Sequence, residues 1–166
     1  MNEEIEAALN EQINEELSSY YIYLSMEAYF ASESLDGFAT WMEYQAREEV
    51  EHAMRIFRFL NDRGARVRLK AIEEPKSVWE SPLAAFKDAY EHEQYITQKI
   101  NELVDLAEEK DDKATLNMLD WFVEEQVEEE ATTEAIVDKL EMVGDSGSGL
   151  LALDKSLASR QMTDEE

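Results

Sequence analysis

The chain has 166 residues, with 40 Asp and Glu against 15 Lys and Arg and a formal net charge of −25 at pH 7. This length suits a single compact domain, and the acidity argues against nucleic acid or an anionic membrane as partners and favours cations. Because the sequence contains no cysteine, disulfides, thiolate metal sites and thiol catalysis are excluded.

Helical periodicity covers two segments of the N-terminal half. Residues 3–32 place apolar side chains at the i, i+3, i+4 recurrence of one helical face, from Ile5 to Tyr20 and Leu24, and Glu16 interrupts this stripe. Residues 37–63 repeat the pattern from Phe38 to Phe59, with polar residues in the same phase. Ser34 to Gly37 provides a short turn between the two predicted helices.

Two further helices are expected at residues 83–109 and 114–143, separated by a short turn at Lys110 to Lys113. The connection from Ala65 to Ser81 is much longer, so it can cross the length of a helical bundle. The sequence therefore predicts an all-α four-helix bundle at residues 1–145, with one crossover between the second and third helices. Residues 146–166 are expected to form a short amphipathic fifth helix, docking on another subunit, and an acidic tail.

The polar interruptions of the four helices form a repeat. Glu49 and His52 lie 33 and 36 residues after Glu16, and the same distances separate Glu93 from two residues of the fourth helix, Gln126 and Glu129. One shift of 77 residues maps the first set onto the second. A pseudo-twofold axis would bring both sets together in the middle of the bundle.

Metal binding explains this pattern better than the alternatives. Glu49-x-x-His52 alone fits a solvated pair on a helix, and a single inward Glu fits a salt bridge to Arg. Four in-phase carboxylates without an inward Lys or Arg would each cost several kcal/mol to bury unpaired. Two divalent ions would balance their charge, and oxygen ligands with one imidazole suit Fe(II) or Mn(II) better than a structural zinc.

The constellation resembles that of the non-haem prokaryotic and archaeal ferritins. The segments LNEQINEELSSYYIYLSM, AREEVEHAM, EHEQYITQKINEL, LDWFVEEQVEEE and LDKSL all have the character of that family. The resemblance implies that Glu16, Glu49 and His52 bind a first iron, with Glu49 as the bridge. It assigns Glu93 and Glu129 to a second iron, with Gln126 alongside.

The resemblance also decides the subtype. Bacterioferritins repeat Glu-x-x-His on the fourth helix and place a haem-ligating Met after the bridging Glu, whereas this chain has Gln126-x-x-Glu129 and Val50. Haem is therefore not expected.

Several other residues have candidate roles near the metals. Similar ferritins use residues equivalent to Glu48, Glu125 and Glu128 for a third iron site facing the shell interior, and a solvated acidic face is the alternative. Tyr23, two turns after Glu16, would hydrogen-bond a ligand or give up an electron, or would simply be a core tyrosine. Trp121 fits bundle packing near the metals. His92 lies about 100° from the inward face, so we expect it toward solvent or a neighbouring subunit.

Iron storage is the expected function. Fe(II) would bind the dinuclear site, be oxidised by O2 or H2O2, and be stored as Fe(III) mineral inside a homo-oligomeric cage, for which the resemblance implies 24 subunits. The alternative is a dinuclear iron protein that scavenges oxygen or peroxide without a mineral core, and a purely structural acidic bundle is disfavoured by the buried charge. The sequence shows no apolar leader or bilayer-spanning run, so a soluble, cytoplasmic protein is expected.

Overall fold

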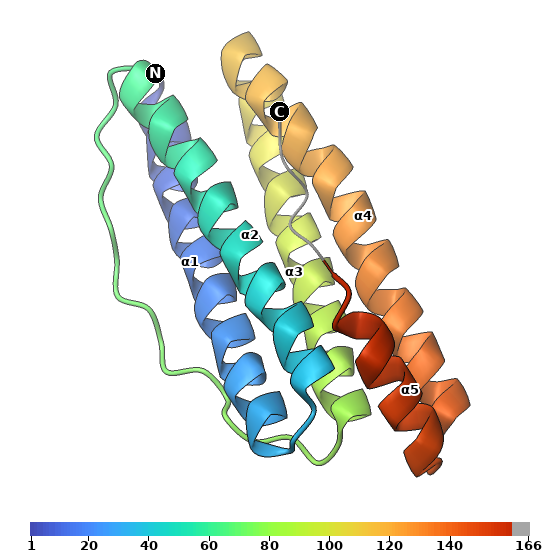
Figure 1. The fold of residues 1–166 in the computed structure, drawn as a ribbon. Coiled ribbons are helices and arrows are strands. Elements are labelled where there is room, and N and C mark those ends of the chain that lie inside the picture. The colour runs from blue at the N-terminus through green and yellow to red at the C-terminus, as the bar shows by residue number, and fades with distance from the viewer. Residues whose placement is uncertain (161–166) are drawn as a thin grey trace.

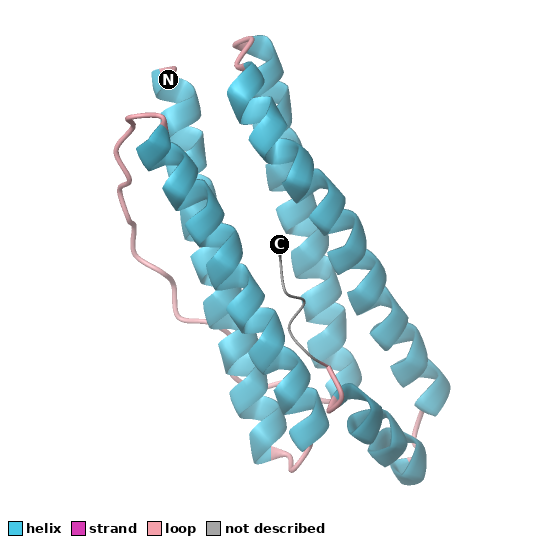
Figure 2. Ribbon diagram, turned by 45° about the horizontal axis from the view of Figure 1, so that its top comes forward, coloured by secondary structure: helices cyan, strands magenta, loops and turns pink. Residues whose placement is uncertain are grey.

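The computed structural model describes residues 1–160, in which every regular element is a helix (Figure 2). Four long helices form a bundle, and a short one follows: α1 (Glu3–Ser32), α2 (Asp36–Asp62), α3 (Pro82–Glu109), α4 (Lys113–Val143) and α5 (Gly147–Leu157). The helices α1 and α2 form one antiparallel hairpin and α3 and α4 the other (Figure 1). This arrangement confirms the predicted fold class.

Side-chain caps explain where four of the helices begin. Each capping side chain accepts a hydrogen bond from a main-chain amide in the first turn of its helix, which satisfies a donor that has no partner within the helix. The caps are Asn2 for α1, Ser81 for α3, Asp112 for α4 and Ser146 for α5. Pro82, directly after Ser81, has the fixed φ that suits the first helical position.

The turns of the two hairpins have the same backbone structure, 77 residues apart. Ser34 and Asp111 both adopt a positive φ, +58° and +52°. In each turn the next amide donates at 3.0 Å to the carbonyl five residues earlier, from Leu35 to Phe30 and from Asp112 to Ala107. The repeat predicted from the ligand spacing therefore extends to the backbone.

The long crossover between α2 and α3 runs along the outside of the bundle (Figure 1). Near its start, the amide of Asn10 donates to the carbonyl of Arg66 at 3.0 Å, and its oxygen accepts from the amide of Arg68 at 2.6 Å. Near its end, the indole of Trp79 donates to Asp88 at 2.7 Å. These contacts fix a segment without secondary structure, which lets α3 begin at the opposite end of the bundle from the end of α2.

Two apolar clusters occupy the two ends of the bundle. One is built around buried aromatic side chains such as Phe30, Phe38 and Phe86, and the other around aliphatic residues such as Leu9, Ile56 and Ile100. Between them lies a layer of buried polar side chains, which we call the polar layer: Gln12, Glu16, Gln45, Glu49, His52, Glu93, Gln126 and Glu129. The fold therefore places its chemistry at mid-bundle.

The buried face of α1 departs from the predicted stripe in its second half. Leu24 is 37% exposed, whereas Tyr23 and Met26 are buried at 0% and 1%. Steps of four residues advance about 40° around a helix, so a stripe extended from Glu16 through Tyr20 to Leu24 turns out of the core.

The short helix α5 packs on its own subunit. Asp154 accepts a hydrogen bond from the amide of Phe38 at 3.0 Å, and Leu153 and Leu157 are buried in the aromatic cluster. The start of α2 therefore holds α5 against its own bundle, and the expectation that the tail docks on another subunit stays a prediction. Leu151 is 63% exposed. The predicted boundary at residue 145 stays a prediction, and the acidic tail after Arg160 lies outside the described residues.

Within residues 1–160, no helix combines the length and the apolar character needed to cross a membrane.

Candidate metal centre

The polar layer gathers side chains from all four long helices. Glu16 comes from α1, Glu49 and His52 from α2, Glu93 from α3, and Gln126 and Glu129 from α4. None of the six is more than 5% exposed. The helical phase thus carries every member of the predicted dinuclear set into the interior of the bundle.

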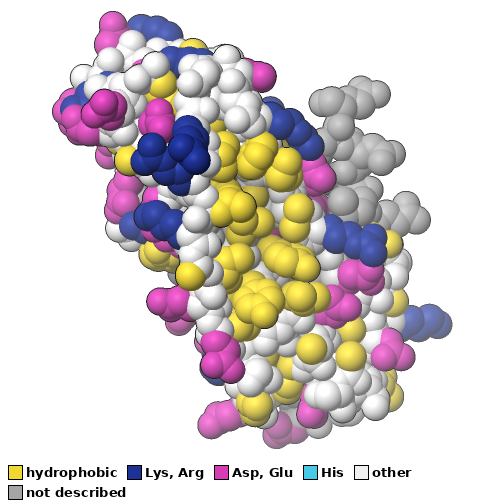
Figure 3. All heavy atoms as spheres, turned by 90° about the vertical axis from the view of Figure 1, so that its left-hand side faces the viewer, with side chains coloured by type: hydrophobic (Ala, Val, Ile, Leu, Met, Phe, Trp, Pro, Cys, Tyr) yellow, Lys and Arg dark blue, Asp and Glu magenta, His cyan; other side chains and the backbone are white. Residues whose placement is uncertain are grey.

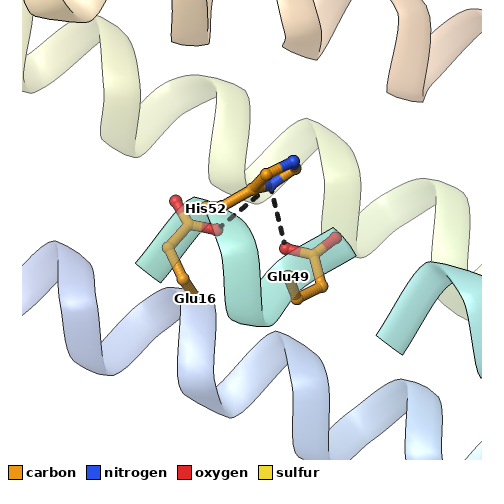
Figure 4. Close-up of side chains that lie close together, drawn as sticks. All are labelled: Glu16, Glu49 and His52. Atoms are coloured by element: carbon orange, nitrogen blue, oxygen red, sulfur yellow. Dashed lines mark ion pairs between the residues drawn. The ribbon is translucent and has the colours of Figure 1, made fainter. Parts of the chain in front are cut away.

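Glu16, Glu49 and His52 form a compact group, drawn in Figure 4. The Nδ1 atom of His52 lies 3.4 Å from a carboxylate oxygen of Glu49 and 3.9 Å from Oε2 of Glu16. One potential ligand atom from each residue lies within 4.8 Å of the others. Glu49 and His52 are three residues apart, so they lie on one face of α2 and meet Glu16 across the helix pair.

Two atoms of this group are buried without a hydrogen-bond partner, Oε2 of Glu16 and Nε2 of His52. An unsatisfied buried polar atom costs free energy unless another partner compensates it. A divalent ion at Oε2 of Glu16 would supply that compensation, and carboxylate oxygens with an imidazole nitrogen are suitable ligands for iron. The residues therefore fit the metal that the sequence predicts.

A second group contains His52, Glu125 and Glu129, which also offer ligand atoms within 4.8 Å of one another. Glu129 is buried and Glu125 is half-buried at the edge of the layer. Gln45 joins the two groups, because its amide donates to Glu129 at 2.7 Å and to Glu49 at 3.2 Å. The carboxylates of Glu49 and Glu129 therefore share one amide nitrogen as their hydrogen-bond donor.

Glu93 is held by neighbours of its own. The hydroxyl of Tyr23 donates to Oε1 of Glu93, and the amide of Gln126 donates to its Oε2 at 3.2 Å and to its main-chain carbonyl at 3.2 Å. Within the described part of the chain, Glu93 belongs to neither compact group. Tyr23 and Gln126 thus fix the orientation of the one carboxylate that α3 contributes.

Burial and mutual repulsion raise the pKa of all four carboxyl groups. The pKa of Glu16 rises to about 8, first because of burial and then because of Glu49. The pKa values of Glu93 and Glu129 also rise to about 8, through burial and through Glu49 and Glu93 respectively. The pKa of Glu49 is raised well above its ordinary value by burial and by Glu129. The burial of these carboxyl groups therefore favours their neutral form, and a bound metal ion would favour the charged form instead.

The predicted third-site residues have different surroundings. Glu48 forms an ion pair with Arg160 at 2.5 Å, Glu125 lies near His52 and Glu129, and Glu128 is exposed. The three do not form one compact group among residues 1–160. The third iron site stays a prediction.

Two aromatic residues border the layer as follows. The ring of Trp121 lies edge-on to His52 with centroids 5.3 Å apart. His92, expected toward solvent or a neighbouring subunit, is half-buried, within hydrogen-bond distance of the Ser19 hydroxyl at 2.7 Å and edge-on to Tyr23. Burial lowers the pKa of His92 to about 4, which keeps a neutral imidazole behind Tyr23.

Sequence reasoning did not assign roles to Gln45 and Arg160. Gln45 lies four residues before Glu49 in the inward phase, which is a usable signal for a neighbour of the ligands. Arg160 lies just beyond an amphipathic segment, and its contacts depend on how α5 packs, so periodicity carries no signal for it.

Comparison with known proteins places this geometry in a family. The Ferritin-like domain model matches residues 6–143. The bacterial non-heme ferritin of Staphylococcus epidermidis is 41% identical over 165 residues, covering 99% of each chain. The chain belongs to the ferritin family.

Further ferritins match over nearly the full length. The bacterial non-heme ferritin of Bacteroides fragilis is 40% identical over 96% of this chain and 99% of its own length. A solved open pore ferritin from Archaeoglobus fulgidus is 52% identical, with a TM-score of 0.96, and the match covers 97% of this chain and 99% of that one. These relatives support iron storage as the function of this ferritin.

Proposed function

We propose that this ferritin oxidises Fe(II) at the polar layer and stores the product as Fe(III) mineral inside a cage. In this proposal, Glu16, Glu49 and His52 bind one Fe(II). Glu93 and Glu129 bind the other, Glu49 bridges the two, and Gln126 lies alongside.

The observation that supports this proposal best is a set of four buried carboxyl groups without a cationic side chain among them. Within residues 1–160, none of Glu16, Glu49, Glu93 and Glu129 forms an ion pair with Lys or Arg. Two divalent ions would supply four positive charges for four carboxylates. Purely structural buried carboxylates would instead be expected beside a fixed cationic partner.

The charge balance suits a substrate that leaves after oxidation. Two Fe(II) ions give up one electron each, and the pair of electrons with two protons reduces O2 to H2O2. H2O2 as oxidant takes two electrons and two protons and gives water. The product ions carry six positive charges against about four negative ones on the carboxylates, so hydroxide binding and release toward a mineral become favourable.

Assembly into a cage is supported by an apolar face on the side of the crossover. Hydrophobic side chains gather in a band on this face (Figure 3). The exposed large hydrophobic residues of α1 and the crossover are Tyr21, Leu24, Leu69, Ile72 and Val78. An exposed apolar band of this kind is typical of an interface, and we propose that further copies of the chain cover it in a shell of 24 subunits. A cytoplasmic location stays a prediction from the sequence.

Aerobic loading with Fe(II) tests the function, with Fe(III) absorbance and particle size measured together. Storage predicts accelerated oxidation and a large particle that retains iron far beyond two ions per subunit. A scavenger without a mineral core would oxidise Fe(II) but retain no more than the site holds. Oxidation no faster than in buffer would contradict both functions.

A further inference from the structure

Arg160 ends the described chain against the metal centre. Its guanidinium donates to the carbonyl of Trp41 at 3.1 Å, to Oε1 of Gln45 at 3.0 Å and to Glu48 at 2.5 Å. It also stacks over the ring of Trp41, 4.3 Å from the centroid. The side chains of Arg160 and Glu48 are 17% and 14% exposed, so this ion pair is much less screened than one on the open surface.

The contact with Gln45 reaches the proposed ligands. A guanidinium donates hydrogen bonds and accepts none, so it can face only the carbonyl oxygen of the Gln45 amide. The NH2 group of that amide is thereby directed at Glu49 and Glu129, to which it donates at 3.2 and 2.7 Å. Arg160 thus sets the orientation of an amide that orients two carboxylates of the centre.

The contact with Glu48 has a different consequence. Glu48 directly precedes the bridging Glu49 and is one of the residues predicted for a third iron site. A metal cation that binds Glu48 competes with the guanidinium for the same carboxylate. Arg160 therefore contacts both the amide beside the proposed ligands and the carboxylate next to Glu49.

We propose that Arg160 is a displaceable counter-ion and a positioning residue of the metal centre. While it is bound, Glu48 is neutralised and Gln45 orients Glu49 and Glu129. When a metal cation takes Glu48, Arg160 is displaced and the amide of Gln45 is free to turn. This inference rests on the proposed function, because it assumes that the polar layer binds divalent ions.

Calorimetric titration with Zn2+ of the assembled, full-length protein tests this role. The variant Arg160→Gln removes the cation, and Arg47→Gln is the matched control, because Arg47 is an exposed residue of α2 whose ion pair, within residues 1–160, is with Glu43 alone. In Arg160→Gln we expect a binding event that depends on Glu48 to tighten by about tenfold. The event that depends on Glu129 should weaken, because Gln45 is no longer fixed. Arg47→Gln should titrate like the wild type.

A double variant separates the two effects. In Arg160→Gln with Glu48→Gln, the tightened event should disappear while the weakened one persists. If Arg160→Gln titrated like the wild type, with the wild type still binding Zn2+ in the layer, only the role of Arg160 would be refuted. If the wild type bound no Zn2+ in the layer, the proposed function would fail, and the inference with it.

A fluorescence measurement covers the case in which Arg160→Gln does not fold. With Trp79 and Trp121 replaced by Phe, the emission reports Trp41 alone, over which the guanidinium stacks. Excess Zn2+ should change this emission in the protein with Glu48 intact, because Arg160 leaves the ring. In Glu48→Gln on the same background the change should be absent. Equal responses of the two proteins would overturn the proposal.

Discussion

Glu49 contacts more of the polar layer than any single ligand role requires. It lies beside Glu16 and His52 and accepts a hydrogen bond from Gln45, and its pKa is raised by burial and then by repulsion from Glu129. These contacts with both helix pairs support the proposal that Glu49 is the bridge.

Removal of the bridge or of the imidazole should slow iron oxidation. We expect Glu49→Ala and His52→Ala each to lower the rate of rapid Fe(II) oxidation by about tenfold or more. Glu51→Ala is the control, because Glu51 is exposed and pairs with Arg58 at 3.7 Å. Stopped-flow absorbance would measure the rates. Wild-type rates in both ligand variants would remove these residues from the site.

The two metal positions should differ in affinity. Gln126 replaces a carboxylate of the first half by a neutral amide, and that amide already donates to Glu93 at 3.2 Å. Anaerobic titration with Fe(II) should resolve a tighter and a weaker event, and Glu129→Ala should abolish the weaker one. Gln126→Glu should narrow the gap, because it adds a charged ligand. Two equal sites in the wild type would contradict this expectation.

At the scale of the elements, the sequence predicted the four long helices and their order. Their apolar stripes and breakers are local signals, and long helices obey them because packing and propensity agree. The inward carboxylates were predictable for the same reason, since they interrupt those stripes in phase. The packing position of α5 was not predictable, because it depends on two segments more than 100 residues apart in sequence. Gly37 has no side chain and so leaves room for the carbonyl of Asp154.

Gly37 should be the residue that allows α5 to pack against the start of α2. A Cβ at this position would lie 1.7 Å from the carbonyl oxygen of Asp154, so Gly37→Ala must displace α5. Although alanine favours a helix by about 1 kcal/mol, we expect a net loss of about 1–3 kcal/mol in the free energy of unfolding. Proteolysis near Ser146 and thermal unfolding would measure it. In the control Gly147→Ala the added Cβ would meet no neighbouring atom within 4 Å. This variant should leave the proteolysis and the thermal unfolding unchanged.

At the scale of the whole molecule, a layer of ionisable groups separates two apolar clusters. In the metal-free protein, charging this layer works against the packing on both sides of it. The stability of the bundle should therefore respond to pH at its centre as well as at its acidic surface.

The metal-free protein should lose stability as the pH rises. The folded-state pKa of Glu16, Glu93 and Glu129 is about 8, above the ordinary 4.5. Their contribution is therefore fully present below about pH 4.5 and is lost as the pH rises through about 8. The midpoint temperature of thermal unfolding should fall from pH 5 to pH 9. Bound Zn2+ should abolish most of this pH dependence, and Glu93→Gln should make it smaller. If neither Zn2+ nor Glu93→Gln changed the dependence of the midpoint on pH, the effect would come from the acidic surface.

The turn repeated at Ser34 and Asp111 bears on the ancestry of the chain. Two residues of different type adopt the same backbone conformation 77 positions apart. Each lies between two helices that carry corresponding inward residues. A single such hairpin, pairing with its own copy about a twofold axis, would already bring two equivalent sets of ligands together. When a crossover joins the two copies in one chain, their sequences no longer have to be identical, and each half can change independently. His52 corresponds to Glu129 and Glu49 to Gln126, and two identical hairpins could not carry these differences.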